Sequence, residues 1–178
     1  MVVQANSSNN GVAGEIHLRK ATAADFHSIR EVARLSRLGA LSHFMTEEEV
    51  EAEVEQYYND DVLNGVLANP ANAIYVVEKG PLMIGHGSVL PEDRRGRPRL
   101  LQFYVRPGFQ RHGVGQMLFD RAKDHLREAG AKEMYISTLG DNEVGRAFLE
   151  KHDCRLLQVY DKIWNGETHS VAFYYLPL

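Results

Sequence analysis

One stretch of the chain, the loop from Gln110 to Gly115, carries residue types that bind a phosphate group. It follows the apolar run from Leu100 to Val105 and holds two glycines, Gly113 and Gly115, separated by one residue. Glycine lets the backbone turn sharply and approach a ligand closely. The first amides of a helix have no partner within it and lie at the positive end of its dipole, so they attract an anion. A strand, this loop and a following helix therefore predict a cradle for a phosphate group.

Three kinds of phosphate-binding loop compete for this stretch. A nucleotide P-loop requires a Lys-Ser/Thr pair after its second glycine, where this chain has Gln116 and Met117. A dinucleotide fingerprint requires a third glycine, whose place is taken by Leu118, and no acidic residue closes a later strand at the usual distance. The third pattern is Gln/Arg-x-x-Gly-x-Gly/Ala after a strand ending in Val-x-Pro. With Val105-Arg106-Pro107 and Gln110-x-x-Gly113-x-Gly115, the chain resembles the acetyl-CoA loop of the GNAT N-acetyltransferase family.

A glycine-rich turn that binds no ligand is the alternative, and the surrounding chain separates the two interpretations. After the loop, Leu118, Ala122, Leu126 and Ala129 recur at helical spacing up to Gly130. A strand from Glu133 to Thr138, then Gly140-Asp141-Asn142 and a helix with Ala147-Phe148-Leu149-Glu150-Lys151, resemble the family's second motif. Two final strands, Arg155 to Ile163 and Thr168 to Leu176, flank the hairpin signal Asn165-Gly166. With an opening strand from Ile16 to Thr22, the resemblance covers about residues 15 to 178.

The elements between the first strand and the loop follow from capping and periodicity. Thr22 with Asp25 predicts a helix start, and Thr46 with Glu47, Glu48 and Glu49 predicts another, with Val50, Val54, Tyr57 and Tyr58 as its buried stripe. Asp60 or Asp61 is expected to cap a short helix through Leu67. Strands Ala73 to Lys79 and Leu82 to Leu90 are separated by Gly80-Pro81, and the arginine-rich segment Glu92 to Arg99 is expected to be an exposed loop.

The resemblance implies a fold and a cofactor site. The fold is a mixed α/β arrangement, a largely antiparallel twisted sheet with helices on both faces, which splays between the strand ending at Val105 and the strand starting near Glu133. Acetyl-CoA is the implied co-substrate, and the amide of Phe103 would face its thioester oxygen and stabilise the oxyanion. The remaining implied cofactor-binding residues are Val105, Gln110, Arg111, His112, Gly113, Val114, Gly115, Gln116, Asn142, Phe148 and Lys151.

The chain departs from the family pattern at two positions. Leu149 stands where the family often has a tyrosine that protonates the departing thiolate. Arg99 stands where the branch that acetylates protein lysines carries a glutamate as its base. The amine must lose a proton, directly or through water, and the thiolate either gains one from a substitute side chain or leaves assisted by water. We predict Tyr104 and His86 for these roles, although each also suits a packed strand residue. His152, His43 and Tyr160 are weaker candidates, and no His/Cys/Asp spacing suggests a metal site.

The acceptor is suggested by an acidic run from Glu47 to Asp61 that contains no basic residue. Carboxylates beside an acceptor cleft would attract a polycationic amine. With Phe44-Met45-Thr46-Glu47-Glu48, the run resembles bacterial polyamine N-acetyltransferases, so Glu47, Glu48 and Glu51 are the predicted substrate-binding residues. A solvated helix face with favourable N-terminal charges explains the same run. Acetylation of protein N-termini or lysines, and a non-catalytic acetyl-CoA sensor, stay open as alternatives.

Composition sets broad limits on organisation and partners. At 178 residues, one domain from residue 15 to 178 is expected, after a flexible tail of residues 1 to 14 rich in Asn, Ser and Gly. A net charge of −4 gives no reason to expect a nucleic acid, and no apolar run is long enough to span a membrane. The single cysteine, Cys154, fits a cytoplasmic location. The expected partner is a small-molecule amine, and a homodimer is left open.

Overall fold

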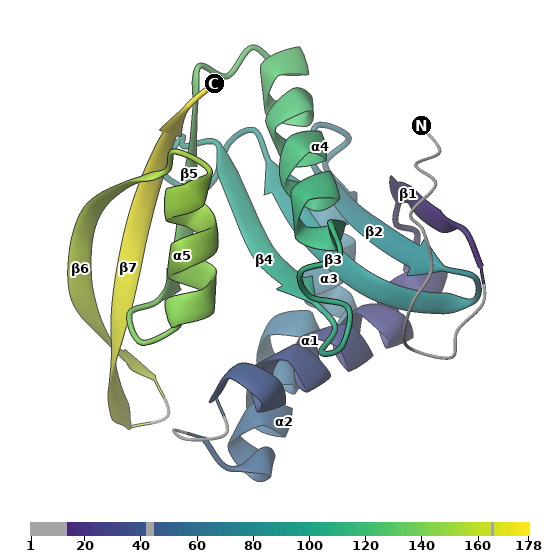
Figure 1. The fold of residues 1–178 in the computed structure, drawn as a ribbon, viewed down its shortest axis with the longest axis horizontal. Helices are drawn as coiled ribbons and strands as arrows, with labels where there is room; N and C mark the ends of the chain where they lie inside the picture. The colour runs from purple at the N-terminus through teal and green to yellow at the C-terminus, as the bar shows by residue number, and fades with distance from the viewer. Residues whose placement is uncertain (1–13, 42–44, 165) are drawn as a thin grey trace.

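A computed structural model describes residues 14–41, 45–164 and 166–178, and within them the strands form one sheet in the order β1-β2-β3-β4-β5-β7-β6 (Figure 1). All neighbouring strands are antiparallel except β4 and β5, which are parallel. The strands are β1 (Ile16–Lys20), β2 (Ala73–Lys79), β3 (Leu82–Leu90), β4 (Arg99–Val105), β5 (Glu133–Leu139), β6 (Arg155–Trp164) and β7 (Glu167–Pro177). The predicted mixed, largely antiparallel sheet is confirmed.

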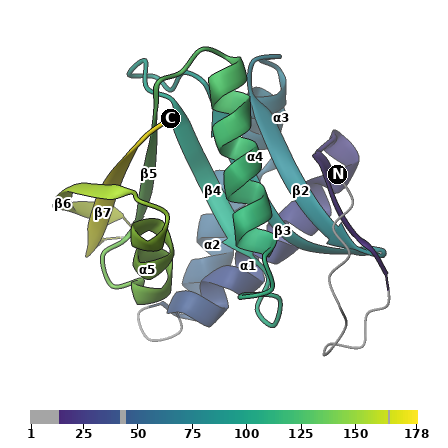
Figure 2. The same cartoon turned by 45° about the horizontal axis from the view of Figure 1, so that its top comes forward.

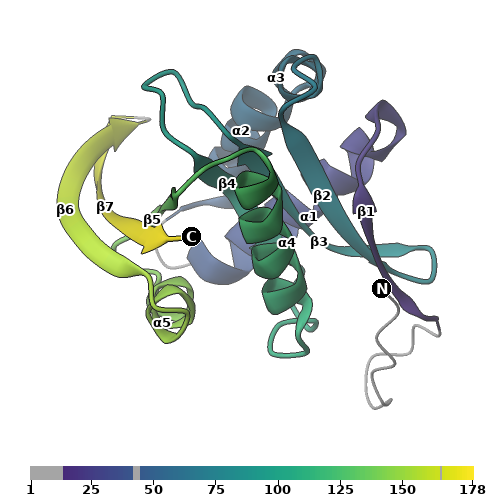
Figure 3. The same ribbon diagram turned by 90° about the horizontal axis from the view of Figure 1, so that it is seen from above.

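Helices cover both faces of this sheet. They are the short 3₁₀ turn η1 (Ala23–Asp25) and the helices α1 (Phe26–Leu41), α2 (Glu47–Tyr58), α3 (Asp60–Leu67), α4 (Val114–Glu128) and α5 (Glu143–Lys151). Figure 3 shows α4 and α5 on one face and α1, α2 and α3 on the other. Each face has its own apolar core: Leu118, Phe119 and Leu126 of α4 belong to one, and Ile29, Val50 and Tyr58 belong to the other. The sheet therefore separates an α4–α5 side from an α1–α3 side.

Local capping explains why the helices begin where they do. The carboxylate of Asp25 accepts a hydrogen bond from the amide of Thr22 at 2.8 Å, and that of Glu49 accepts one from the amide of Thr46 at 2.6 Å. These reciprocal caps satisfy amides that a helix start leaves free. The start of α3 corrects the sequence prediction, because Asn59, rather than Asp60 or Asp61, supplies the cap by accepting from the Val62 amide at 2.9 Å.

Some other expectations need adjustment or fall outside the described residues. Arg99 opens β4 instead of belonging to the exposed loop, and its side chain is mostly buried, with 11% exposed. The β6–β7 hairpin is confirmed by the pairing of Trp164 with Glu167, while Asn165 of its turn lies outside the described residues. His43, Phe44 and the predicted tail up to residue 13 lie outside them too. The division into a tail and one domain stays a prediction.

The helices are short or amphipathic. Where the structure describes the chain, none of them has the length and apolar composition needed to cross a bilayer.

Candidate active site

The central feature of the candidate site is the divergence of β4 from β5. The two parallel strands are paired only at Arg99 with Tyr135 and at Leu100 with Ile136. Beyond that point the strands run apart (Figure 2), so β4 from Leu101 to Tyr104 has no ladder partner on its β5 side. Backbone amides and carbonyls need hydrogen-bond partners. The predicted splay is confirmed, and it leaves one edge of β4 available to a ligand.

A bulge in β4 sets the direction of the residues that follow. The β3–β4 register shifts between His86 and Ser88, and Gln102 adopts a left-handed φ of 50°. The Gln102 side chain secures this conformation, since Oε1 accepts from the Ser88 hydroxyl at 2.9 Å and Nε2 donates to the Tyr57 carbonyl at 3.0 Å. A bulge bends a strand and redirects its side chains. Phe103 consequently packs against the α4-side core, while Tyr104 packs against the α1-side core.

The predicted phosphate loop leads directly into α4. Gly113 caps the helix with a left-handed φ of 82°, and the Met117 amide is bonded to the Gly113 carbonyl at 2.9 Å. The preceding amides of Val114, Gly115 and Gln116 have no carbonyl one turn earlier in the helix. They lie at the positive end of the helix dipole, which favours an anion. A Cβ atom added at Gly113 would meet nothing within 4 Å, so the space beside this cap is open.

Side chains of the loop brace it and leave its amides available. His112 Nδ1 lies 2.7 Å from the Gln110 carbonyl oxygen, and Gln110 Nε2 donates to the Val105 carbonyl at 3.5 Å. Gln116 is bonded to Asp120 at 2.7 Å. Arg111 is exposed and has a left-handed φ of 63°. The loop thus combines open amides, the helix dipole and an exposed guanidinium, a donor set that fits the pyrophosphate of a coenzyme A.

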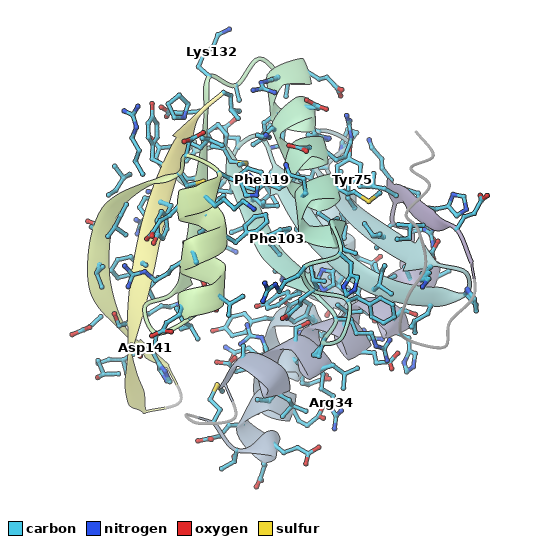
Figure 4. All side chains as sticks on the ribbon, in the orientation of Figure 1. Arg34, Tyr75, Phe103, Phe119, Lys132 and Asp141 are labelled. Carbon is cyan, nitrogen blue, oxygen red and sulfur yellow. The ribbon has the colours of Figure 1, made fainter. Side chains whose placement is uncertain are left out.

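The residues predicted on α5 lie across the divergence from β4, but they differ in what their side chains do. The Phe148 ring lies 5.6 Å from that of Phe103, and Figure 4 shows Phe103 and Phe119 between α4 and α5. The Asn142 side chain caps α5, with Oδ1 accepting from the Gly145 amide at 2.9 Å. Lys151 is exposed at the end of α5. The aromatic wall of Phe148 suits the pantetheine arm, whereas the Asn142 side chain is committed to its helix.

The two predicted proton-transfer residues lie next to each other on the α1 side of the sheet. The ring centroids of His86 and Tyr104 are 5.6 Å apart, and Tyr58 lies 6.0 Å from His86. His86 is 1% exposed, and its two ring nitrogens and the Tyr58 hydroxyl make no hydrogen bond within the usual geometric limits to any residue that the structure describes. Burial lowers the pKa of His86 to about 3, so its imidazole is neutral. Tyr104 is half-buried and is therefore more accessible than His86.

A buried ion pair beside Tyr104 escaped sequence analysis. The guanidinium carbon of Arg37 in α1 lies 5.7 Å from the centre of the Tyr104 ring. Arg37 is paired with Glu53 of α2, which is 2% exposed. The two residues belong to different helices, and Glu53 stands among other acidic residues, so no local pattern marked the pair. The pair links α1 and α2 beside the Tyr104 ring.

The acidic run is partly neutralised by α1. Arg34 is ion-paired with Glu47 at 2.6 Å and also with Glu51. Glu48 is exposed and makes no ion pair within the described chain. Of the three predicted substrate-binding residues, two therefore share one arginine.

The departures from the family pattern have different surroundings. Leu149 is 3% exposed and belongs to the α4-side core. Arg99 lies on the other face of the sheet from Leu149 and donates a hydrogen bond to the Ser137 hydroxyl at 2.7 Å. Within residues 14–41, 45–164 and 166–178, no three His, Cys, Asp or Glu side chains are grouped to hold a metal ion.

Known structures share this architecture. PaiA N-acetyltransferase from Thermoplasma acidophilum, solved with coenzyme A, has a TM-score of 0.70 and 19% identity, covering 88% of this chain and 97% of its own. The yncA protein of Salmonella typhimurium, solved with acetyl-CoA, has a TM-score of 0.63 and 18% identity, covering 91% and 93%. The ribosomal-protein-S18-alanine N-acetyltransferase of Escherichia coli has a TM-score of 0.67 and 12% identity, covering 91% and 93%. At these identities, the likeness is one of fold.

A match to a family model shows which family the chain belongs to, which a shared fold alone does not show. The acetyltransferase (GNAT) family model matches residues 35–153, more than half of the chain, and this range includes β4, the loop and α5. Acetyl-CoA is accordingly the co-substrate, and the open amides at the start of α4 fit it. The chain belongs to the acetyltransferase (GNAT) family and is an N-acetyltransferase.

Proposed function

We propose that this protein transfers the acetyl group of acetyl-CoA to a primary amine that enters from the α1–α3 side of the sheet. The observation that carries this proposal is the unpaired edge of β4, which leads from the closed end at Leu100 to the α4 loop. Acetyl-CoA supplies an activated thioester, so the acetyl group ends on the amine nitrogen and the sulfur leaves as a thiol. We place the amine on the α1–α3 side because Tyr104, the proposed proton donor, packs on that face of the sheet.

The backbone of β4 and the loop would hold the co-substrate. The amide of Phe103 lies in the unpaired part of β4, where it is suited to donate to an oxygen that gains negative charge during the reaction. The amides of Val114, Gly115 and Gln116, with the Arg111 guanidinium, would bind the pyrophosphate. Gly115 allows a close approach, since a Cβ atom there would lie 3.3 Å from the Phe148 ring. These roles depend mainly on backbone atoms.

Proton transfer is assigned to Tyr104 and its surroundings. A primary amine is mostly protonated at neutral pH and must lose a proton before it attacks. Tyr104 is the more accessible of the two candidates, and His86 lies beside it as a buried, neutral imidazole. We propose that Tyr104 delivers the proton that the departing sulfur needs. His86 and the Arg37–Glu53 pair would position the ring, while water accepts the proton of the amine.

A polyamine is one candidate for this primary amine. Glu48, Glu55 and Asp61 support it, because they are exposed and make no ion pair in the described part of the chain. The pairing of Arg34 with Glu47 and Glu51 counts against it, since the guanidinium already offsets one of their two negative charges. A protein N-terminus or lysine is a further alternative. Leu149 supports a sensor without turnover, because it cannot donate a proton.

The remaining expectations concern organisation. We propose one catalytic domain from residue 15 to 178, a cytoplasmic location supported by the free thiol of Cys154, and a monomer or homodimer that gel filtration would distinguish.

An acetyl-CoA turnover assay against a panel of amines tests the proposal. Release of the coenzyme thiol would be followed with spermidine, amino acids, short peptides with a free N-terminus and peptides with a lysine. Turnover of at least one class, with the acetyl group found on nitrogen by mass spectrometry, is expected. Tight acetyl-CoA binding by calorimetry without turnover of any amine would favour the sensor instead.

A further inference from the structure

Two arginines lie on the α1–α3 side of the sheet, near the end of β4 that pairs with β5. Leu100 points into the α4-side core, so the neighbouring Arg99 points to the opposite face. Arg99 is paired with Tyr135, but its Nη2 donates to the hydroxyl of Ser137, two residues further along β5. Since β4 and β5 are parallel, Ser137 is level with Leu101. The guanidinium therefore reaches from the paired end of the strands toward the point where they separate.

The positive charge at this end is only partly balanced. The Asp93 carboxylate is the one that contacts both arginines, at 3.5 Å from Arg97 and 3.4 Å from Arg99, among the residues that the structure describes. Charge-assisted bonds are usually about 2.7–2.9 Å long. Asp93 is held away because it also accepts the amides of Arg95 at 2.8 Å and Arg97 at 3.0 Å. The three side chains together carry one net positive charge.

Other nearby groups leave this charge in place. Glu133 lies at the start of β5, two residues before Tyr135 and away from the divergence, and it accepts a hydrogen bond from the Tyr135 hydroxyl at 2.8 Å. The Nε atoms of Arg97 and Arg99 are buried and have no hydrogen-bond partner in the described chain. Buried charges and donors without full compensation are costly, so they call for an explanation.

Aromatic rings hold both guanidinium groups in place. The guanidinium carbons of Arg97 and Arg99 lie 5.1 Å and 5.3 Å from the centre of the Phe173 ring. The Tyr135 ring is stacked on Phe173 at 5.5 Å with an interplanar angle of 8°. Arginine stacks well on such surfaces, and a guanidinium fixed in this way loses little entropy when it binds a planar anion.

We propose that the acceptor amine carries a carboxylate, which binds to Arg97 and Arg99 near the paired end of β4 and β5 while the amine reaches the thioester near Phe103. The inference rests on the proposed function, because it names the acceptor class for the same site. Because Gln102 is bulged, the three steps of β4 from Leu101 to Tyr104 span only the length of two steps on β3, about 7 Å at about 3.3 Å per residue. Phe103 therefore lies within about 7 Å of the level of Leu101. That span matches an amine separated from its carboxylate by several bonds, as in a dipeptide or an ω-amino acid. A polycation would meet repulsion there.

Matched acceptor pairs test the inference without any mutation. The probes are 6-aminohexanoate with 6-aminohexanamide, and Ala-Ala with Ala-Ala amide, and each pair differs only in the carboxylate. At low salt the wild-type kcat/KM is expected to be about tenfold or more higher for the acid, which corresponds to one good charged contact. Spermidine, assayed in parallel, is expected to be a poorer acceptor than the acids. The preference should fade as the salt concentration rises.

Variants then assign the preference to the arginines. Arg99→Gln and Arg97→Gln should each reduce the kcat/KM ratio of acid to amide toward one, mainly through KM for the acid, and leave acetyl-CoA affinity unchanged. Arg94→Gln is the control, because it removes the same charge from an exposed position in the same loop. Thermal melting of each variant checks that it is folded.

The outcomes separate two failures. Equal wild-type activity on acid and amide, or a clear preference for spermidine, would overturn the inference and leave the acetyltransferase proposal standing. A preference for the acids that survives in both arginine variants would overturn it as well. Binding of acetyl-CoA without turnover of any amine would overturn the proposed function, and the inference with it.

Discussion

Gly113 and Gly130 flank the two ends of α4 with nearly the same left-handed backbone, at φ values of 82° and 86°. A Cβ atom added at either glycine would meet nothing within 4 Å. The two positions thus impose the same backbone strain on a substituted residue, but only Gly113 borders the predicted pyrophosphate site.

Replacing Gly113 with leucine is expected to weaken acetyl-CoA binding by tenfold or more in calorimetry. A left-handed non-glycine residue costs about 1–2 kcal/mol, and its side chain would occupy the open space beside the helix amides. Gly130→Leu carries the same strain at the other end of α4 and should leave the affinity unchanged. A similar loss of affinity in both variants would show that helix stability, and not the loop, is responsible.

Tyr104→Phe removes the hydroxyl proposed to protonate the departing sulfur. We expect kcat to fall by about 10²–10⁴-fold, the usual contribution of general acid catalysis, with acetyl-CoA affinity retained. The pH–rate profile should change as well. An unaltered rate and an unaltered profile would remove Tyr104 from the mechanism.

His86 gives a prediction about stability against pH. Its pKa is about 3 in the folded chain and about 6.5 when unfolded, so the unfolded state binds the proton first as the pH falls. Stability is therefore fully present above about pH 6.5 and is lost progressively toward pH 3. Urea unfolding at several pH values gives the free energy of unfolding as a function of pH. This free energy should fall more steeply with decreasing pH in the wild type than in His86→Leu, by up to about 1.4 kcal/mol per pH unit. Parallel curves would mean that water reaches the imidazole.

The predictable parts of the fold are those that depend on residues close together in the sequence. Thr22 with Asp25, and Thr46 with Glu49, gave two helix starts, and the spacing of the apolar residues before Gly130 gave α4. The bulge at Gln102 was not predictable, because glutamine carries no local preference for a left-handed backbone and is held there by Ser88 and Tyr57. It depends on contacts between segments that are distant in sequence.

The candidate site divides in the same way. Its backbone part, the loop from Gln110 to Gly115, follows from a short motif. Its side-chain part does not, since Arg37 reaches Glu53 from another helix and Arg99 reaches Ser137 from another strand. Likewise, the acidic run contains no basic residue in the sequence, but in the structure Arg34 of α1 pairs with it and reduces its negative charge.

Leu149→Tyr tests whether the tyrosine often found in this family can be restored. Because Leu149 is 3% exposed within the α4-side core, the larger ring must overpack it, at a cost of about 1–3 kcal/mol in the free energy of unfolding. We expect a lower melting temperature and no gain in kcat. Leu149→Met, which nearly conserves volume, should change both little. A rate gain in the tyrosine variant would show that its hydroxyl reaches the sulfur.

Arg34 and the glutamates that it pairs with allow the polyamine hypothesis to be tested in two directions. Arg34→Gln leaves Glu47 and Glu51 without their partner and increases the negative field of α2, whereas reversing Glu47, Glu48 and Glu51 to lysine makes the field positive. If that field guides a polycation, the KM for spermidine should fall in the first variant and rise in the second. Both effects should shrink at high salt, with acetyl-CoA affinity unchanged. Shifts in the same direction, or none at low salt, would leave the acidic run as a solvated helix face.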